Sequence, residues 1–185
     1  MKKIGILLFS FLLIGACTQK ENQYIIKNKQ VGKINDSTKV SQLEQIFSND
    51  SIVKNTEGVS AFESYDEFVV FDKNSNEPLL LIIPEETNNP ESLIKQVEIL
   101  DPRYKTQKGI NINSSYGEIN KAHKIKKIET SLNYIVVYID DLNAIVDIKK
   151  SELPLRLQNN PGLKIDKTMI PDKAKIKHFI VFINE

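Results

Sequence analysis

Short apolar runs separated by turn-forming residues make up most of the chain after residue 23. Several runs have the length of a strand and are rich in Ile, Val, Phe and Tyr, which favour pleated, half-buried surfaces. Asp, Asn and Pro between the runs are typical of tight connections. The pattern therefore predicts strands at 24–26, 31–34, 60–63, 68–71, 79–83, 97–99, near 128, 134–139, 144–148 and 176–183.

Two segments have the spacing of amphipathic helices instead. Val40, Leu43 and Phe47 recur on one face of a predicted helix over 39–47. Ser115 and Glu118 form a capping box, in which each side chain accepts a hydrogen bond from the first turn, so a short helix is predicted to begin after Ser115. Further helical turns are expected at 91–96 and after Pro171, and 140–143 is expected to connect two strands of a hairpin.

The predicted elements give an α+β fold of antiparallel strands with a few short helices in one domain, residues 24–185. Their order repeats: a glycine, a strand, a capped helix and several strands occur twice. Segments 32–38 and 109–115 match when one gap is allowed. The repeat indicates two similar halves, 24–104 and 105–185, produced by duplication. The alternative is that any α+β chain produces such similarities.

The first 23 residues have a different character. Lys2 and Lys3 precede an apolar run over 4–14, and two small residues then precede Cys17, the only cysteine in the chain. This arrangement is typical of a signal peptide, and the residues around Cys17 resemble a bacterial lipobox. A membrane-spanning helix needs roughly 20 apolar residues, which is more than this run provides. An ordinary secretory signal that leaves Cys17 as a free thiol is the other alternative.

We therefore expect residues 1–16 to be a lipoprotein signal peptide and residues 17–23 to be a lipidated cysteine and its tether. Several acyl chains on Cys17 would anchor the protein stably, since each buried methylene contributes about 0.8 kcal/mol. The expected location is the cell envelope of a Gram-negative bacterium. Thr18, which stands where some envelope lipoproteins have Asp, favours the outer membrane.

Charge and composition exclude some classes of function. Loss of residues 1–16 removes Lys2 and Lys3 and no acid, so the formal net charge changes from +1 to −1. Nucleic acid is not an expected partner, because its binding depends on a concentrated basic surface. His123 and His178 are the only histidines and have no ligand spacing, so no metal site and no cofactor site is predicted. Each is expected to be structural or on the surface.

Four other groups of residues are candidate sites. The paired acids at 85–86 and 140–141 could serve glycoside hydrolysis, but their positions beside predicted turns favour solvated residues. The lysines at 121, 124, 126 and 127 could approach anionic lipid headgroups or cell-wall polymers, or could be a solvated helix end. Ser37 and Ser51 follow Asp and resemble O-glycosylation sites of some envelopes, although Ser37 can also cap a helix.

The chain resembles the sigma-E-regulated envelope lipoproteins of Gram-negative bacteria, a family of uncharacterised function. The resemblance rests on Cys17 in its lipobox, on 32–35 followed by Ser and Thr, on Glu57-Gly58, and on 112–119 entering a helix. The chain differs from the family in lacking a cysteine pair and a tryptophan in its C-terminal half, and in having Asn113 where glycine is typical. The resemblance implies an envelope lipoprotein and supplies no catalytic motif.

These features predict a lipid-anchored module that binds or supports an envelope component such as an assembly factor, a cell-wall polymer or another protein. No catalytic residue is predicted, and the protein is not expected to be an enzyme. Two alternatives stay open: an inhibitor that blocks a lytic enzyme through an exposed loop, and a hydrolase whose carboxylates are distant in sequence but gathered by the fold.

Overall fold

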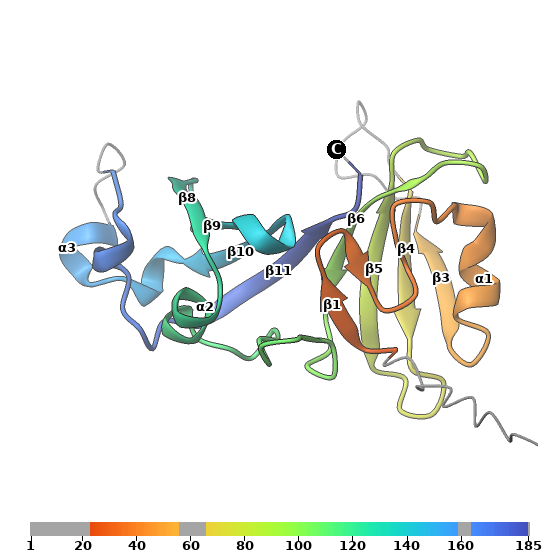
Figure 1. Cartoon of the computed structure of the whole chain (residues 1–185), viewed down its shortest axis with the longest axis horizontal. Coiled ribbons are helices and arrows are strands. Elements are labelled where there is room, and N and C mark those ends of the chain that lie inside the picture. Colours follow the sequence, from red (N-terminus) through yellow and green to blue (C-terminus); the bar gives the residue numbers. More distant parts are fainter. Residues whose placement is uncertain (1–22, 56–65, 159–163, 185) are drawn as a thin grey trace, which may run out of the picture.

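The fold is α+β, as predicted, and is built around one antiparallel sheet of eight strands (Figure 1). The structure is a computed structural model that describes residues 23–55, 66–158 and 164–184. The strands lie in the order β3-β4-β5-β6-β11-β10-β9-β8, so the last strand of each half, β6 and β11, pair at the centre. Their bounds are β3 Ser51–Asn55, β4 Glu67–Phe71, β5 Pro78–Pro84, β6 Ile94–Ile99, β8 Ile125–Thr130, β9 Tyr134–Ile139, β10 Ala144–Lys149 and β11 Ile176–Phe182.

A small three-stranded sheet and several short helices complete the described part of the chain. The small sheet has the order β2-β1-β7, in which β1 pairs antiparallel with β2 and parallel with β7. Its bounds are β1 Ile25–Lys27, β2 Gln30–Val31 and β7 Lys105–Thr106. The helices are α1 Leu43–Ile46, α2 Tyr116–Ala122 and α3 Leu155–Gln158, with 3₁₀ turns η1 Val40–Gln42, η2 Asp140–Leu142, η3 Lys150–Glu152 and η4 Lys167–Met169.

One hydrophobic core runs under both halves of the large sheet. Alternate residues of the central strands are fully buried, as the period of a strand requires when one face is covered. In Figure 1 α1 and the small sheet lie against the first half of the large sheet, while α2 and α3 accompany the second half. The core therefore lies between the large sheet and these elements, and each half contributes to it.

The two halves repeat the same local hydrogen bonds 76 residues apart. The Asn35 N–H donates to the Thr38 hydroxyl, and the Asn111 N–H donates to that of Ser114. The Thr38 N–H donates back to the Asn35 carbonyl, and the Ser114 N–H donates back to the Asn111 carbonyl. One half of the capping box also recurs, because the Lys39 N–H donates to the Gln42 side chain at 2.8 Å as the Ser115 N–H donates to the Glu118 side chain at 2.7 Å. Only Ser115 also accepts a hydrogen bond through its own side chain. The two halves thus have equivalent helix starts, whereas a common origin by duplication stays a prediction.

Several predicted elements need correction. The helical turn expected over 91–96 is wrong, because Ile94 already begins β6 and is fully buried there. Pro171 opens a single hydrogen-bonded turn, in which the Ala174 N–H donates to the Pro171 carbonyl, and the 3₁₀ turn η4 precedes it. Strands β3 and β7 and helix α3 were not predicted. The strand expected over 60–63 lies outside the described residues. No helix within the described part of the chain is long and apolar enough to span a membrane.

Candidate ligand pocket

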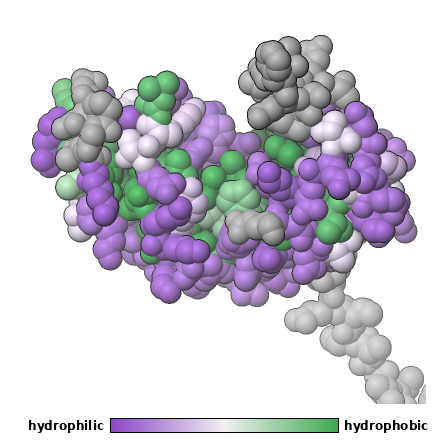
Figure 2. All heavy atoms as spheres, turned by 90° about the horizontal axis from the view of Figure 1, so that it is seen from above, coloured by the Kyte–Doolittle hydropathy of each residue, from purple (hydrophilic) through white to green (hydrophobic). Residues whose placement is uncertain are grey.

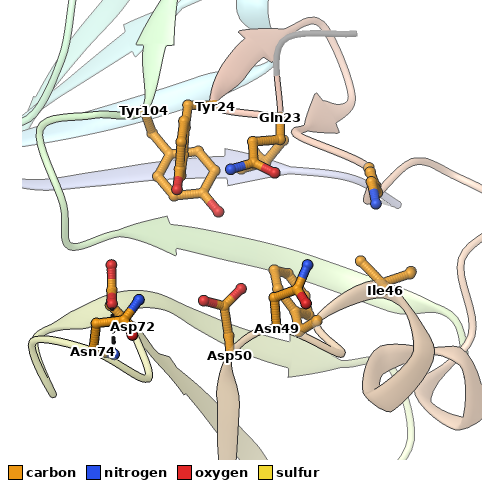
Figure 3. A pocket seen from close by; sticks show the side chains of 11 residues that line it. Gln23, Tyr24, Ile46, Asn49, Asp50, Asp72, Asn74 and Tyr104 are labelled. Atoms are coloured by element: carbon orange, nitrogen blue, oxygen red, sulfur yellow. Dashed lines mark hydrogen bonds between the residues drawn. The ribbon is translucent and has the colours of Figure 1, made fainter. Parts of the chain in front are cut away.

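A pocket of about 210 Å³ lies between the small sheet and the first half of the large sheet. Its walls come from five separate stretches of the chain: the residues that precede β1, the end of β2 with the turn after it, the segment from the end of α1 to the start of β3, the β4–β5 turn and the residue that precedes β7 (Figure 3). We call it the tyrosine pocket. Its lining residues are Gln23, Tyr24, Val31, Lys33, Ile46, Phe47, Asn49, Asp50, Asp72, Asn74 and Tyr104.

Two tyrosines form one wall of the pocket. The rings of Tyr24 and Tyr104 pack edge to face, with centroids 5.1 Å apart. Tyr104 is buried, and burial is the main cause that raises the pKa of its hydroxyl, so the hydroxyl is a neutral donor at physiological pH. In Figure 3 both hydroxyl groups point across the pocket toward the side of Asp50. The wall therefore offers an aromatic surface that ends in polar groups.

Asp50 provides the charge on the opposite wall. It precedes β3, and its N–H donates to the Phe47 carbonyl. Among the described residues its carboxylate has no hydrogen-bond or ion-pair partner, and it is half-buried. Burial raises the pKa of Asp50, and the negative charge of Asp72 raises it further. A carboxylate held in this way is poorly solvated and gains most from a cationic or hydrogen-bond-donating ligand.

Arg103 neutralises the second acid of the pocket. Its guanidinium donates to Asp101 through Nε and Nη2, at 2.9 and 3.0 Å, and to Asp72 through Nη1 at 2.7 Å. The hydrogen bond from Arg103 lowers the pKa of Asp72, so that carboxylate is ionised but paired. The guanidinium also lies 5.3 Å from the centre of the Tyr24 ring. Arg103 thus fixes Asp72 and Tyr24 in place. Asp50 has no direct ion pair among the described residues, and the more distant charges of Arg103 and Lys73 only partly offset the rise in its pKa.

In the second half a histidine occupies the position equivalent to Phe47 of the tyrosine pocket. His123 lies 76 residues after Phe47, and each residue caps its helix by donating its N–H one turn back. The His123 ring is buried, with Nδ1 2.9 Å from Asp141 and Nε2 3.2 Å from the Thr106 hydroxyl. Lys108 also contacts Asp141, at 3.2 Å. The second half therefore has a hydrogen-bonded cluster at the position where the first half has Phe47 in the wall of the tyrosine pocket.

His123, Asp141 and Thr106 have the order of a catalytic triad but lack its access. The Thr106 side chain is buried and its hydroxyl already accepts from the Ile110 N–H. A nucleophile must reach a substrate, so the structure gives this cluster a packing role. His123 lies at the C-terminus of α2.

His178 lies in β11, and its Nδ1 is 2.6 Å from Glu98 in β6. The nearby Asp147 in β10 is paired in register with His178 across the strands, and its Oδ1 is buried without a partner among the described residues. Burial raises the pKa of Asp147. No group of three or more metal-ligating side chains occurs in the part of the chain that the structure describes.

The paired acids considered from sequence do not converge on the tyrosine pocket. Asp140 binds Lys124 at 2.9 Å and Asp141 binds His123 and Lys108, while the acids at 85–86 are exposed at the end of β5. The lysines at 121, 124, 126 and 127 are all exposed along the α2–β8 segment. The pocket residues could not be predicted from sequence, because no two of the five stretches that line the tyrosine pocket form a motif.

Cys17 and Glu57-Gly58 lie outside the described residues. Ser37 is exposed, and its hydroxyl donates to the Asn35 side chain at 2.7 Å. Ser51 begins β3 beside Asp50 and is half-buried. Nothing in these contacts tests lipidation at Cys17 or glycosylation at either serine.

Comparison with known proteins gives one informative similarity. No family model and no curated protein matches the chain. Among solved structures, the uncharacterized protein yfeY from Escherichia coli is similar with a TM-score of 0.54 and 11% sequence identity. The similarity covers 86% of this chain and 99% of yfeY. At this identity the similarity shows a shared fold and nothing about function.

Proposed function

We propose that this protein is a lipid-anchored module of the bacterial envelope, attached through Cys17, which binds a ligand in the tyrosine pocket. The observation that carries the binding function is the unpaired carboxylate of Asp50, which faces two tyrosines in a pocket built from five stretches of chain. The resemblance to sigma-E-regulated lipoproteins is part of this proposal and supports only the envelope location.

The chemistry of the walls favours a ligand with a primary ammonium group. Asp50 can accept its hydrogen bonds, and the rings of Tyr24 and Tyr104 suit a cation. Lys33, also in the lining, is exposed and would suit an anionic group of the same ligand. Residues 17–23 span at most roughly 25 Å when extended, so the pocket would stay close to the membrane surface.

A titration followed by amide chemical shifts tests this binding function. The probe is O-phosphoethanolamine, and the matched control is ethyl phosphate, which lacks only the amine. We expect shifts at the amides of Asn49, Asp50 and Asn74 with the probe and at least about fivefold weaker binding of the control. In Asp50→Asn the two compounds should bind alike. Equal binding of both compounds to the native chain would contradict the proposal.

A hydrolase is the second candidate, and one specific observation favours it. Asp50 and Asp72 line the same pocket, and the pKa of one is raised while that of the other is lowered. Such a pair can divide the roles of general acid and general base. Turnover of envelope polysaccharide or peptide that is lost in both Asp50→Asn and Asp72→Asn would select this function over simple binding.

A further inference from the structure

Two strongly exposed leucines lie at the end of the second half, away from the tyrosine pocket. Leu132 lies at the tip of the β8–β9 hairpin and is 88% exposed, and Leu155 begins α3 and is 80% exposed. Among the described residues the one other exposed large apolar side chain is Val53. In Figure 2 hydrophobic residues stand out from the hydrophilic surface at the end of the molecule that carries α3. Two such residues at one end indicate an interaction surface, whereas scattered single ones do not.

Hydrogen bonds fix the turns from which both leucines project. The Ser131 N–H donates to the Tyr134 carbonyl at 2.9 Å, which closes the hairpin turn around Leu132. In α3, the side-chain amide of Gln158 donates to the carbonyl of the residue that ends η3, at 2.7 Å. Leu155 and Gln158 are three residues apart and therefore share one face of α3. The two leucines are thus presented to solvent by ordered turns.

An open recess of about 440 Å³ connects the hairpin tip with α3 and contains two lysines. Leu132 lines it together with Lys149, Lys150 and Gln158. The Lys150 N–H donates to the Asn133 carbonyl at 3.0 Å, which brings η3 beside the hairpin tip. The ammonium groups of Lys149 and Lys150 have no hydrogen-bond or ion-pair partner in the described part of the chain. Two unpaired cations therefore lie beside the exposed leucines.

The acids nearest to these lysines in the sequence have other partners. The Glu152 carboxylate accepts from the Lys175 N–H at 3.2 Å. Asp147 of β10 interacts with the histidine of β11 and the glutamate of β6. Glu129, close to the end of β8, pairs with Lys127 at 2.8 Å. The positive charge beside the leucines is therefore not cancelled by a local ion pair among the described residues.

We propose that this end of the molecule lies on an anionic lipid surface. Leu132 and Leu155 enter the interface, while Lys149 and Lys150 meet the headgroups, and the exposed Arg156 adds a further cation. Apolar side chains combined with lysines at headgroup level are typical of interfacial membrane contacts. A fluid lipid surface accepts two separate protruding side chains, whereas a protein partner would need a surface shaped to fit both.

This contact needs neither the tyrosine pocket nor acylation of Cys17, but it has a consequence for an anchored chain. β1, which follows the first described residues, lies in the first half, and α3 lies at the far end of the second half (Figure 1). A lipid on Cys17 together with the leucine contact would lay the longest axis of the molecule along the bilayer. Only this orientation rests on the anchor that we propose above.

Site-specific fluorescence of the full chain tests the proposal. Cys17→Ala removes the only cysteine, so Leu132→Cys provides one position for an environment-sensitive label, and Asp36→Cys, exposed in the first half, is the matched control. On vesicles of phosphatidylglycerol and phosphatidylcholine in equal parts, the label at position 132 should shift its emission to the blue and be quenched by spin-labelled lipid. The label at position 36 should do neither. No quenching at position 132, or equal quenching at both positions, would overturn the proposal.

The same label tests the role of charge. Its quenching should be at least about threefold weaker on vesicles of phosphatidylcholine alone. Lys149→Gln with Lys150→Gln should cause a similar loss on the anionic vesicles, whereas Lys121→Gln with Lys126→Gln, the same charge change in the α2–β8 segment, should not. Leu155→Asn should also weaken the quenching, with an unchanged circular dichroism spectrum. Equal effects of the two lysine pairs would contradict the assignment. So would a blue shift that grows with protein concentration without vesicles, because the leucines would then bind a second copy.

Discussion

Asp50 is the residue at which stability and binding are expected to conflict. Its carboxylate has a raised pKa in the folded chain, chiefly because it is partly buried and secondarily because Asp72 is near. An acid whose folded pKa is raised is less favourably ionised in the folded chain than in the unfolded chain, so it lowers stability above its unfolded pKa, about 3.9. Such a cost is typical of a residue kept for function.

The variant Asp50→Asn should therefore be slightly more stable than the native chain at pH 7, by up to about 1 kcal/mol, although it loses the ligand. Urea denaturation at pH 7 and pH 3 measures the effect, which should be smaller at pH 3, where the native carboxylate is largely protonated. Asp36→Asn, at an exposed position outside the pocket, is the control. A clear loss of stability in Asp50→Asn would mean that its carboxylate has a structural partner.

Arg103 should control the acid sensitivity of the first half. The pKa of Asp72 is lowered by its hydrogen bond from Arg103, and in Asp101 the same partner outweighs the opposing effect of burial. An acid with a lowered folded pKa contributes stability that is complete above its unfolded value and is lost as the pH falls through the folded value. The loss is therefore expected below about pH 4.

Replacement by Arg103→Gln should remove most of that contribution. The variant should be less stable than the native chain at pH 7, and the difference should shrink as the pH falls from 4 to 2. Denaturation curves across this range provide the measurement, and Arg156→Gln, which has no ion pair among the described residues, is a matched control. A difference independent of pH would show that Arg103 acts by packing alone.

At the scale of elements, α2 depends on its capping box. The Ser115 hydroxyl accepts from the Glu118 N–H, and the Glu118 carboxylate accepts from the Ser115 N–H at 2.7 Å. Ser115→Ala should cost about 1 kcal/mol of unfolding free energy, since the first turn loses one partner. Ser151→Ala, at an exposed serine, should change stability by less than about 0.5 kcal/mol. Equal effects of the two changes would contradict the role of the cap.

The cluster around His123 ties α2 to β7 and to η2. His123→Phe introduces the residue found at the equivalent position 47, but it leaves the buried Thr106 hydroxyl and Asp141 without the imidazole. We expect a loss of roughly 1–3 kcal/mol. Denaturation at pH 7 measures it, with Thr106→Val as a second variant that removes the other partner. Full stability of His123→Phe would show that both halves tolerate an apolar residue here.

Elements with a complete local signal could be predicted from sequence. The capping box predicted α2, and the acidic turn at 140–143 predicted the β9–β10 hairpin. β3 was missed because its last residues are exposed at the edge of the sheet, and β7 because two residues give no period. The sequence of 91–96 predicts a helical turn, because the feature that makes Ile94 a strand residue is its pairing with Pro84 of another strand, which the segment itself does not reveal.

No local sequence pattern comparable to the capping box indicates the tyrosine pocket. Tyr24, Asp50, Asp72 and Tyr104 are brought together only when the small sheet packs on the large one. In the sequence, the only pattern that includes Asp50 is the Asp-Ser pair of the candidate glycosylation site at Ser51. A pocket made from isolated residues of distant elements depends on tertiary structure, and no pattern within one segment could reveal it.

At the scale of the whole molecule, the position of the pocket connects the two parts of the proposed function. Gln23 and Tyr24, the first residues that the structure describes, line the pocket. A lipid on Cys17 would therefore hold the binding site beside the membrane from which the chain extends. Anchoring and binding should then depend on each other in the envelope, although they use different residues.

Photo-crosslinking in intact cells shows whether the anchored chain holds a ligand in the tyrosine pocket, with a photoreactive amino acid in place of Asn49 in the pocket wall. We expect a crosslinked product in the membrane fraction that is lost in Asp50→Asn and is strongly reduced in Cys17→Ala. The same amino acid in place of the exposed Lys173 should give no such product. A product that persists unchanged in both variants would contradict the account.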